Sequence, residues 1–238
     1  MHEKMLIQSH DVHIWSTELT ASPEQEEHLN QDERNRANRF KFLKHRQRYI
    51  AARSMLRQIL SFYLSCAPQD IHFAYTEHHK PYLSIPNNAL QFNLSHSEDR
   101  AIYAFTLQHA IGVDIEKVQA SYNKSVAQRF FSPQENEALE HLSPKENSIG
   151  FYRIWSRKEA IIKAVGKGLV IPIASFSVAV SDVVETISLE NDEWSLIPLT
   201  IHEDFQAALA TNQRVHQIYY WELFDNNPSL RYAQRIEI

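Results

Sequence analysis

Glycine is scarce in this chain, and the shortage narrows the folds that it can adopt. The 238 residues contain only four glycines, Gly112, Gly150, Gly166 and Gly168. The phosphate loop of P-loop proteins and the dinucleotide fingerprint of doubly wound α/β folds both need several glycines close together. The sequence therefore excludes both motifs, and any phosphate would be bound by side chains, helix ends or a metal ion.

The predicted strands and helices follow one another without the regular strand–helix–strand rhythm of parallel α/β folds. Alternating apolar residues predict strands in the segments 5–19, 91–95, 101–105, 111–118, 175–180, 205–210 and 218–224, with one more around Trp194. Apolar residues at helical spacing predict helices over 46–60, 133–142 and 149–165. We therefore expect an α+β fold with small antiparallel sheets and packed helices.

The charge and the cysteine content limit the kinds of site and the cellular compartment that the protein can have. The formal net charge is −5, and Cys66 is the single cysteine, which excludes an internal disulfide and a cysteine-rich metal site. The chain does not begin with a basic segment followed by an apolar run, and no stretch approaches ~18 uninterrupted apolar residues. We expect a soluble, cytoplasmic protein that binds neither a membrane nor, given its acidity, nucleic acid.

The predicted helix over 149–165 places a charge where apolar side chains gather. Lys158 falls within the apolar arc formed by residues such as Ile154, Trp155 and Ile161, and Glu159 lies beside it. A lysine drawn out of water needs an anion, because burying an unpaired ammonium group is costly. The partner is either a carboxylate of the protein, in an ordinary salt bridge, or an anionic ligand.

A pair of carboxylates lies on the strand predicted over 111–118. Ile111, Val113 and Ile115 face the core together, so Asp114 and Glu116 share the opposite face, where Gly112 is expected to leave open space. Two such carboxylates can hold a hard cation such as Mg²⁺ together with substrate phosphates. The alternative is a solvated strand face, which D-x-E patterns commonly form.

A basic segment precedes these motifs. Between residues 34 and 57 the chain has nine lysines and arginines and no acidic residue. This concentration of charge fits a phosphate-rich ligand, an acidic protein partner or a solvated basic helix.

Two helix-end signals follow. Ser132, Pro133 and Glu135 have the form of a capping box, which gives Glu135 a structural reason to be present. Gly166, just after the helix over 149–165, is predicted to cap its end with positive φ.

In sequence order, these motifs closely resemble those of the Sfp-type 4′-phosphopantetheinyl transferases. The matching segments are Lys80-Pro81-Tyr82, Phe92 to Ser97, Ile111 to Glu116, Arg129 to Ser132, and Trp155 to Lys163 with Gly166 to Leu169. The resemblance implies two similar α+β halves, here 1–110 and 111–238, with coenzyme A in the cleft between them. It also implies a monomer.

The resemblance implies a reaction as well. The serine hydroxyl of an apo acyl or peptidyl carrier protein attacks the β-phosphate of coenzyme A, phosphopantetheine moves to the serine, and adenosine 3′,5′-bisphosphate leaves. The family's pattern assigns Asp114, Glu116 and Glu159 as ligands of Mg²⁺, with Mn²⁺ as an alternative. The general base is left open among Glu159, Glu135 and a metal-bound water.

The remaining roles implied by the resemblance are contacts with coenzyme A. Lys158, Lys163, Ser95 and His96 are expected at its phosphates, and Lys80 and Pro81 along its adenine. Arg48 and Arg53 are candidates for the 3′-phosphate on charge density, since the basic helix matches the family only loosely. His79 stands where the family usually has glycine, so the turn before Lys80 can differ.

Two other functions compete with transfer. One is a non-catalytic protein of the same fold that binds coenzyme A or a carrier, although the four key residues Asp114, Glu116, Glu159 and Lys163 are intact. The other is a Mg²⁺-dependent phosphohydrolase that acts on a nucleotide. The sequence does not identify the carrier or the pathway that it serves.

Overall fold

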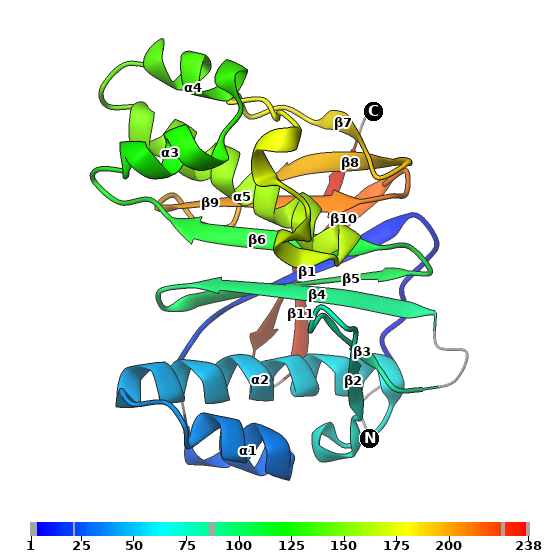
Figure 1. The fold of residues 1–238 in the computed structure, drawn as a ribbon. Coiled ribbons are helices and arrows are strands. Elements are labelled where there is room, and N and C mark those ends of the chain that lie inside the picture. The colour runs from blue at the N-terminus through cyan, green and yellow to red at the C-terminus, as the bar shows by residue number, and fades with distance from the viewer. Residues whose placement is uncertain (1–3, 21, 86–88, 225–226, 237–238) are drawn as a thin grey trace.

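Two β-sheets lie face to face at the centre of the molecule, and a long helix covers the outer face of each (Figure 1). The computed structural model describes residues 4–20, 22–85, 89–224 and 227–236. Buried aliphatic residues of both sheets, such as Ile14, Ile102, Val113 and Leu209, form one apolar cluster between the sheets. Each outer face has its own cluster against its helix, so the core has three layers of apolar contact.

The first sheet has the strand order β11-β10-β1-β5-β4. Its strands are β1 (Asp11–Glu18), β4 (Leu90–Ser97), β5 (Arg100–Leu107), β10 (Gln217–Phe224) and β11 (Asn227–Arg235). Neighbouring strands are antiparallel except β1 and β10, which run parallel. The sheet thus joins both ends of the chain.

The second sheet has the order β6-β9-β8-β7 and is antiparallel throughout. Its strands are β6 (Ile111–Lys117), β7 (Glu185–Leu189), β8 (Asp192–Leu199) and β9 (Phe205–Thr211). A separate pair, β2 (Phe73–Tyr75) and β3 (Pro81–Leu83), carries the loop that contains His79.

The helices are α1 (Gln31–Ala37), α2 (Leu43–Leu64), α3 (Lys124–Phe130), α4 (Pro133–Glu140) and α5 (Asn147–Val165). Short 3₁₀ turns cover Pro23–His28, Pro68–Asp70, Gly168–Val170 and Ile173–Ser175. The long helices α2 and α5 lie on the first and second sheet respectively (Figure 1). The expected α+β class is confirmed.

Most of the predicted elements form. The hairpin is β4 and β5, the carboxylate strand is β6, and the capping box at Ser132 is complete, with Glu135 reaching back to the Ser132 N–H. Gly166 ends α5 with φ of 76°. The predicted strand over 175–180 is wrong, because its alternating residues pack as irregular backbone whose N–H groups bond to carboxylates instead of a neighbouring strand.

The division expected at residue 110 falls between β5 and β6, which belong to different sheets. The C-terminal strands β10 and β11 nevertheless return to the first sheet and pair with β1. If the halves are defined by their sheets, the first half is therefore discontinuous in sequence, whereas the strands of the second half, β6 to β9, follow one another without interruption by the first sheet. Within the described residues, no helix combines the length and apolar character needed to cross a membrane.

Candidate active site

The acidic residues of β6 lie where β4, β6 and α5 meet. Ser95 and Ser97 of β4 donate hydrogen bonds to Asp114 Oδ1 at 2.7 Å and to Glu116 Oε2 at 2.9 Å. Asn93 of the same strand accepts from the Val113 N–H at 2.9 Å. Since alternate residues of a strand share one face, β4 presents a row of polar side chains to β6. These contacts hold the two sheets in register at the site.

Gly112 allows α5 to approach β6 closely. A Cβ atom at this position would lie 2.1 Å from the Ala160 carbonyl oxygen and 2.3 Å from the Ala164 nitrogen. The expected open space beside the carboxylates is therefore wrong, because the backbone of α5 fills it. The close approach brings Glu159 and Lys163 of α5 to the carboxylates of β6.

Asp114 and Lys163 form the centre of the site. Lys163 Nζ lies 2.6 Å from Asp114 Oδ1 and donates to Ser95 Oγ at 2.9 Å. Asp114 is 3% exposed, and its second oxygen, Oδ2, is buried without a hydrogen-bond partner in the structure. A buried carboxylate oxygen without a partner carries a desolvation cost, so this position is suited to a cationic or donor ligand.

Burial and the charge of Asp114 both oppose the ionisation of the two glutamates of the site. Burial, and then the negative charge of Asp114, raises the pKa of Glu116 to about 7. The same two causes, in the same order, raise the pKa of Glu159, while Lys163 acts in the opposite direction. Three acidic groups thus converge electrostatically, and a bound cation would relieve their repulsion.

The carboxylate oxygens of the site are of the kind that binds a hard divalent cation. Within the part of the chain that the structure describes, no three acidic, histidine or cysteine side chains are arranged as a formed metal site. The oxygen ligands that Mg²⁺ prefers are nevertheless available from Asp114, Glu116 and Glu159, and Asp114 Oδ2 has no other partner.

A cleft of about 280 Å³ adjoins these residues. Glu159 and Lys163 of α5 line it together with His79, Lys80 and Pro81. The Lys80 ammonium group does not project freely into the cleft, since it donates to the carbonyls of Ile111 at 3.1 Å and Ala164 at 3.0 Å. Burial lowers the pKa of Lys80 to about 8.

His96 interacts electrostatically with Lys163 and Asp114 of the site and with Arg48. Desolvation lowers the pKa of His96, and the charges of Lys163 and Arg48 lower it further. Arg48 donates to Glu98 in the β4–β5 turn at 2.9 Å. His96 is thus within electrostatic reach of the carboxylate site, and Arg48 is within reach of His96.

The structure gives Arg53 a structural partner. Its Nε donates to Glu33 Oε1 at 2.8 Å, and the neighbouring Arg57 donates to the other Glu33 oxygen at 2.7 Å. Arg53 is 7% exposed. The predicted contact between Arg53 and the 3′-phosphate is therefore not supported, because Glu33 neutralises this part of the basic segment inside the protein.

Lys158 also has a structural partner. Its ammonium group lies 2.9 Å from Glu135 Oε2 and donates to the carbonyls of Ile173 and Phe176, and both charged side chains are almost fully buried. Its N–H donors are thus used within the protein. This geometry argues against Lys158 as a phosphate contact and against Glu135 as a general base, and it favours the salt-bridge interpretation of the helix.

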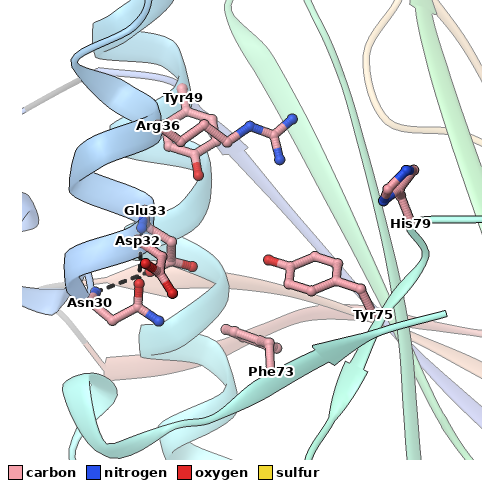
Figure 2. A pocket seen from close by; sticks show the side chains of 8 residues that line it. All are labelled: Asn30, Asp32, Glu33, Arg36, Tyr49, Phe73, Tyr75 and His79. Atoms are coloured by element: carbon pink, nitrogen blue, oxygen red, sulfur yellow. Dashed lines mark hydrogen bonds between the residues drawn. The ribbon is translucent and has the colours of Figure 1, made fainter. Parts of the chain in front are cut away.

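The sequence analysis gave Ser97 no role in the site. Its place on the same strand face as Ser95 was the only signal for such a role. A second cavity, of about 590 Å³, lies between α1, α2 and the β2–β3 hairpin and was also missed (Figure 2). Arg36 and Tyr49 lie on the helical side of this cavity, and Tyr75 and His79 lie across from them on the hairpin. The cavity brings together segments far apart in sequence, so no local pattern indicates it.

Comparisons with known proteins identify the family of the chain. The model of the 4′-phosphopantetheinyl transferase superfamily matches residues 110–211, and that of the 4′-phosphopantetheinyl transferase N-terminal region matches residues 14–108. The chain is 34% identical over 220 residues to the 4′-phosphopantetheinyl transferase HetI of Nostoc sp., covering 90% of this chain and 92% of that protein. It is 35% identical over 150 residues to Sfp of Bacillus subtilis, covering 63% and 66% of the two chains.

The fold and the matched regions define an enzyme that transfers a group. The chain belongs to the 4′-phosphopantetheinyl transferase superfamily, and the resemblance stated from its motifs is confirmed.

Proposed function

We propose that this protein transfers 4′-phosphopantetheine from coenzyme A to the serine hydroxyl of an apo acyl or peptidyl carrier protein, with release of adenosine 3′,5′-bisphosphate. The observation that carries the proposal is the convergence of Asp114, Glu116, Glu159 and Lys163 beside a cleft. Acidic ligands together with one lysine suit a pyrophosphate group and its counter-ion. The names of the relatives support the same reaction.

In this proposal coenzyme A occupies the cleft beside Lys163, with its adenosine end toward Pro81. His79 lines both this cleft and the larger cavity of Figure 2, so the two spaces adjoin. Arg36 offers a cation in the larger cavity, where Arg53 is engaged by Glu33. We therefore favour Arg36 over Arg53 for the 3′-phosphate.

Asp114, Glu116 and Glu159 would hold Mg²⁺, or Mn²⁺ in its place. The bound ion supplies charge neutralisation at the pyrophosphate. The fit rests on the unpartnered Asp114 Oδ2 and on the raised pKa values of the two glutamates.

The side chains have separate roles in the transfer. Lys163 offsets the negative charge that grows on the phosphoryl oxygens, and His96 donates a hydrogen bond that orients them. Ser95, which donates to Asp114 and accepts from Lys163, holds these two side chains in place. We favour Glu159 as the group that accepts the proton of the carrier serine, because it lines the cleft beside Lys163. The burial of Glu135 beside Lys158 argues against the same role for Glu135.

Intact-protein mass spectrometry of apo carrier proteins incubated with this protein, coenzyme A and Mg²⁺ tests the proposal. We expect a mass gain of one phosphopantetheine that EDTA prevents. Glu159→Gln should lower the rate at least about 100-fold, since it removes an electrostatic group of the site. Glu140→Gln, an exposed change on α4, is the matched control and should retain the rate.

Other outcomes distinguish the competing functions. Tight binding of coenzyme A without a mass gain on any carrier would favour a non-catalytic binding protein. Cleavage of coenzyme A in the absence of a carrier, abolished by Asp114→Ala, would favour a phosphohydrolase. We further propose a cytoplasmic monomer, which sedimentation of the purified protein and fractionation of cells would check.

A further inference from the structure

The start of α2 exposes apolar side chains. Phe42 and Leu43 are 61% and 64% exposed, and Phe40 is 39% exposed. Phe40 lies against Tyr49 and Phe42 against His45, at ring separations of 5.3 and 5.9 Å, so the side chains are supported on one side only. Exposed apolar groups concentrated in a short segment often mark an interaction surface.

Positive charge surrounds these apolar side chains. Arg39 and Lys41 are exposed, and within the described ranges neither forms a salt bridge. Lys44 is 70% exposed at its side chain and lies 4.0 Å from Glu98, at the limit of an ion pair. The first turn of α2 has no acidic residue and no side-chain cap, so its free N–H groups add partial positive charge.

This surface is continuous with the active site. Lys44 and Arg48 line a cleft together with Glu98 and Lys117. The Lys117 N–H donates to Ser97 Oγ at 3.1 Å, and Ser97 donates to Glu116 Oε2 at 2.9 Å. A macromolecule seated on the start of α2 would therefore border the carboxylate end of the site.

We propose that the α2 docking patch, defined as Arg39, Phe40, Lys41, Phe42, Leu43 and Lys44, binds an acidic, partly apolar face of the carrier protein that receives the phosphopantetheine. The inference rests on the proposed function, since it names where the second substrate docks. An apolar centre with a charged rim is the usual form of a protein interface, and a phosphate ligand would not need Phe42 or Leu43.

Charge complementarity selects an acidic partner over a second copy of this chain. A symmetric dimer through this patch would bring the same cations of both copies together, because each copy contributes the same surface. An acidic carrier instead pairs its carboxylates with Lys41, Lys44 and the free N–H groups of α2. The overall charge of −5 makes this patch a local exception on the protein.

Direct binding of an apo carrier protein, measured by fluorescence anisotropy without coenzyme A, tests the patch independently of catalysis. Phe42→Ser with Leu43→Ser should raise the carrier Kd at least about 10-fold, as loss of a central apolar contact does. Lys41→Glu with Lys44→Glu should weaken binding and reduce its salt dependence. Val183→Ser with Leu230→Ser removes comparably exposed apolar groups elsewhere and should change nothing.

The kinetic readout separates this inference from the proposed function. In the transfer assay both patch variants should raise KM for the carrier and leave KM for coenzyme A unchanged. An unchanged carrier Kd in both variants would overturn the docking patch even if the wild type is active. If the variants lose coenzyme A binding to the same extent as carrier binding, the patch belongs to coenzyme A instead. If the wild type self-associates and the serine variant does not, the patch binds a second copy of this chain.

If the wild type binds carriers through the patch but transfers nothing, the proposed function fails and the docking patch stands. Far-ultraviolet circular dichroism of each variant checks that it folds. If the variant with Phe42→Ser and Leu43→Ser unfolds, the variant with Lys41→Glu and Lys44→Glu still tests the patch.

Discussion

Buried charge decides the role of individual residues in this protein. Lys158 and Lys163 lie on the same helix five positions apart, and each is paired with a carboxylate. Lys158 is 1% exposed with its donors engaged, whereas the Lys163 side chain is 28% exposed beside a cleft. The first therefore belongs to the scaffold, and the second remains available to a ligand.

Lys158→Met should destabilise the protein without weakening coenzyme A binding. Removing one partner leaves Glu135 charged and buried, which costs about 3–5 kcal/mol in the free energy of unfolding. Urea denaturation measures the loss, and Lys145→Met, at an exposed lysine, is the control. A normal free energy of unfolding combined with weak coenzyme A binding would contradict the structural role of Lys158.

His13 should make stability depend on pH. Its ring is 3% exposed and hydrogen-bonded to the Tyr63 hydroxyl at 2.8 Å, and burial lowers its pKa to about 3. The unfolded chain binds a proton near the ordinary pKa of about 6.5, but the folded protein does not. The contribution of His13 to the free energy of unfolding is therefore fully present above pH 6.5 and is lost progressively as the pH falls toward 3.

The decline should reach about 1.4 kcal/mol per pH unit below the unfolded pKa. His13→Asn should remove this part of the slope when denaturation curves are compared between pH 7 and about 4. Identical pH slopes for the two proteins would show that His13 is protonated in the folded state.

At the scale of elements, α5 is fixed at both of its faces. Arg157 pairs with Glu185 of β7 on one side, and Lys80 binds the last turn of the helix from the other. Carbonyls at a helix C-terminus attract cations, and Lys80 also binds the start of β6 through the Ile111 carbonyl. Lys80 thereby holds α5 and β6, and with them Lys163 and Asp114, at a constant separation.

Lys80→Met should loosen the end of α5. The loss of two hydrogen bonds from a charged donor should cost about 1–3 kcal/mol in the free energy of local opening. Hydrogen exchange of the amides of Ala164 and Val165, measured without coenzyme A, should accelerate. Lys80→Arg keeps the charge and should restore part of the protection, while equal exchange rates in all three proteins would argue against the contact.

For the whole molecule, the parallel pair β1 and β10 closes the fold. Ile218 of β10 pairs with Val12 of β1, and both side chains are fully buried between the sheets. The C-terminal strands therefore complete the sheet on which α2 packs, although they lie far from the active site in sequence.

Ile218→Asp should prevent stable folding, because an unpaired carboxylate would enter the cluster between the two sheets. Thermal denaturation followed by circular dichroism should show a large fall in Tm or no cooperative transition. Val183→Asp, at a position 46% exposed, is the control and should melt like the wild type. A similar Tm for both variants would show that β10 contributes little.

The sequence by itself determined the local elements and the acidic residues of the site. Alternating apolar positions predicted β4 to β6, and helical spacing with a capping box predicted α4 and α5, because these signals depend on neighbours within a few residues. The order of the motifs indicated the family and selected Asp114, Glu116, Glu159 and Lys163. These signals need no knowledge of what packs against each element.

Only the tertiary structure decided which charges are free. Glu33 engages Arg53 and Glu135 engages Lys158 across 20 or more positions of sequence, so the local pattern could not distinguish these cations from those of the site. The same holds for Gly112, whose missing Cβ admits the backbone of α5, and for the pairing of β10 with β1. Desolvation and pairing depend on distant segments meeting in space, and this information is absent from any short stretch of the chain.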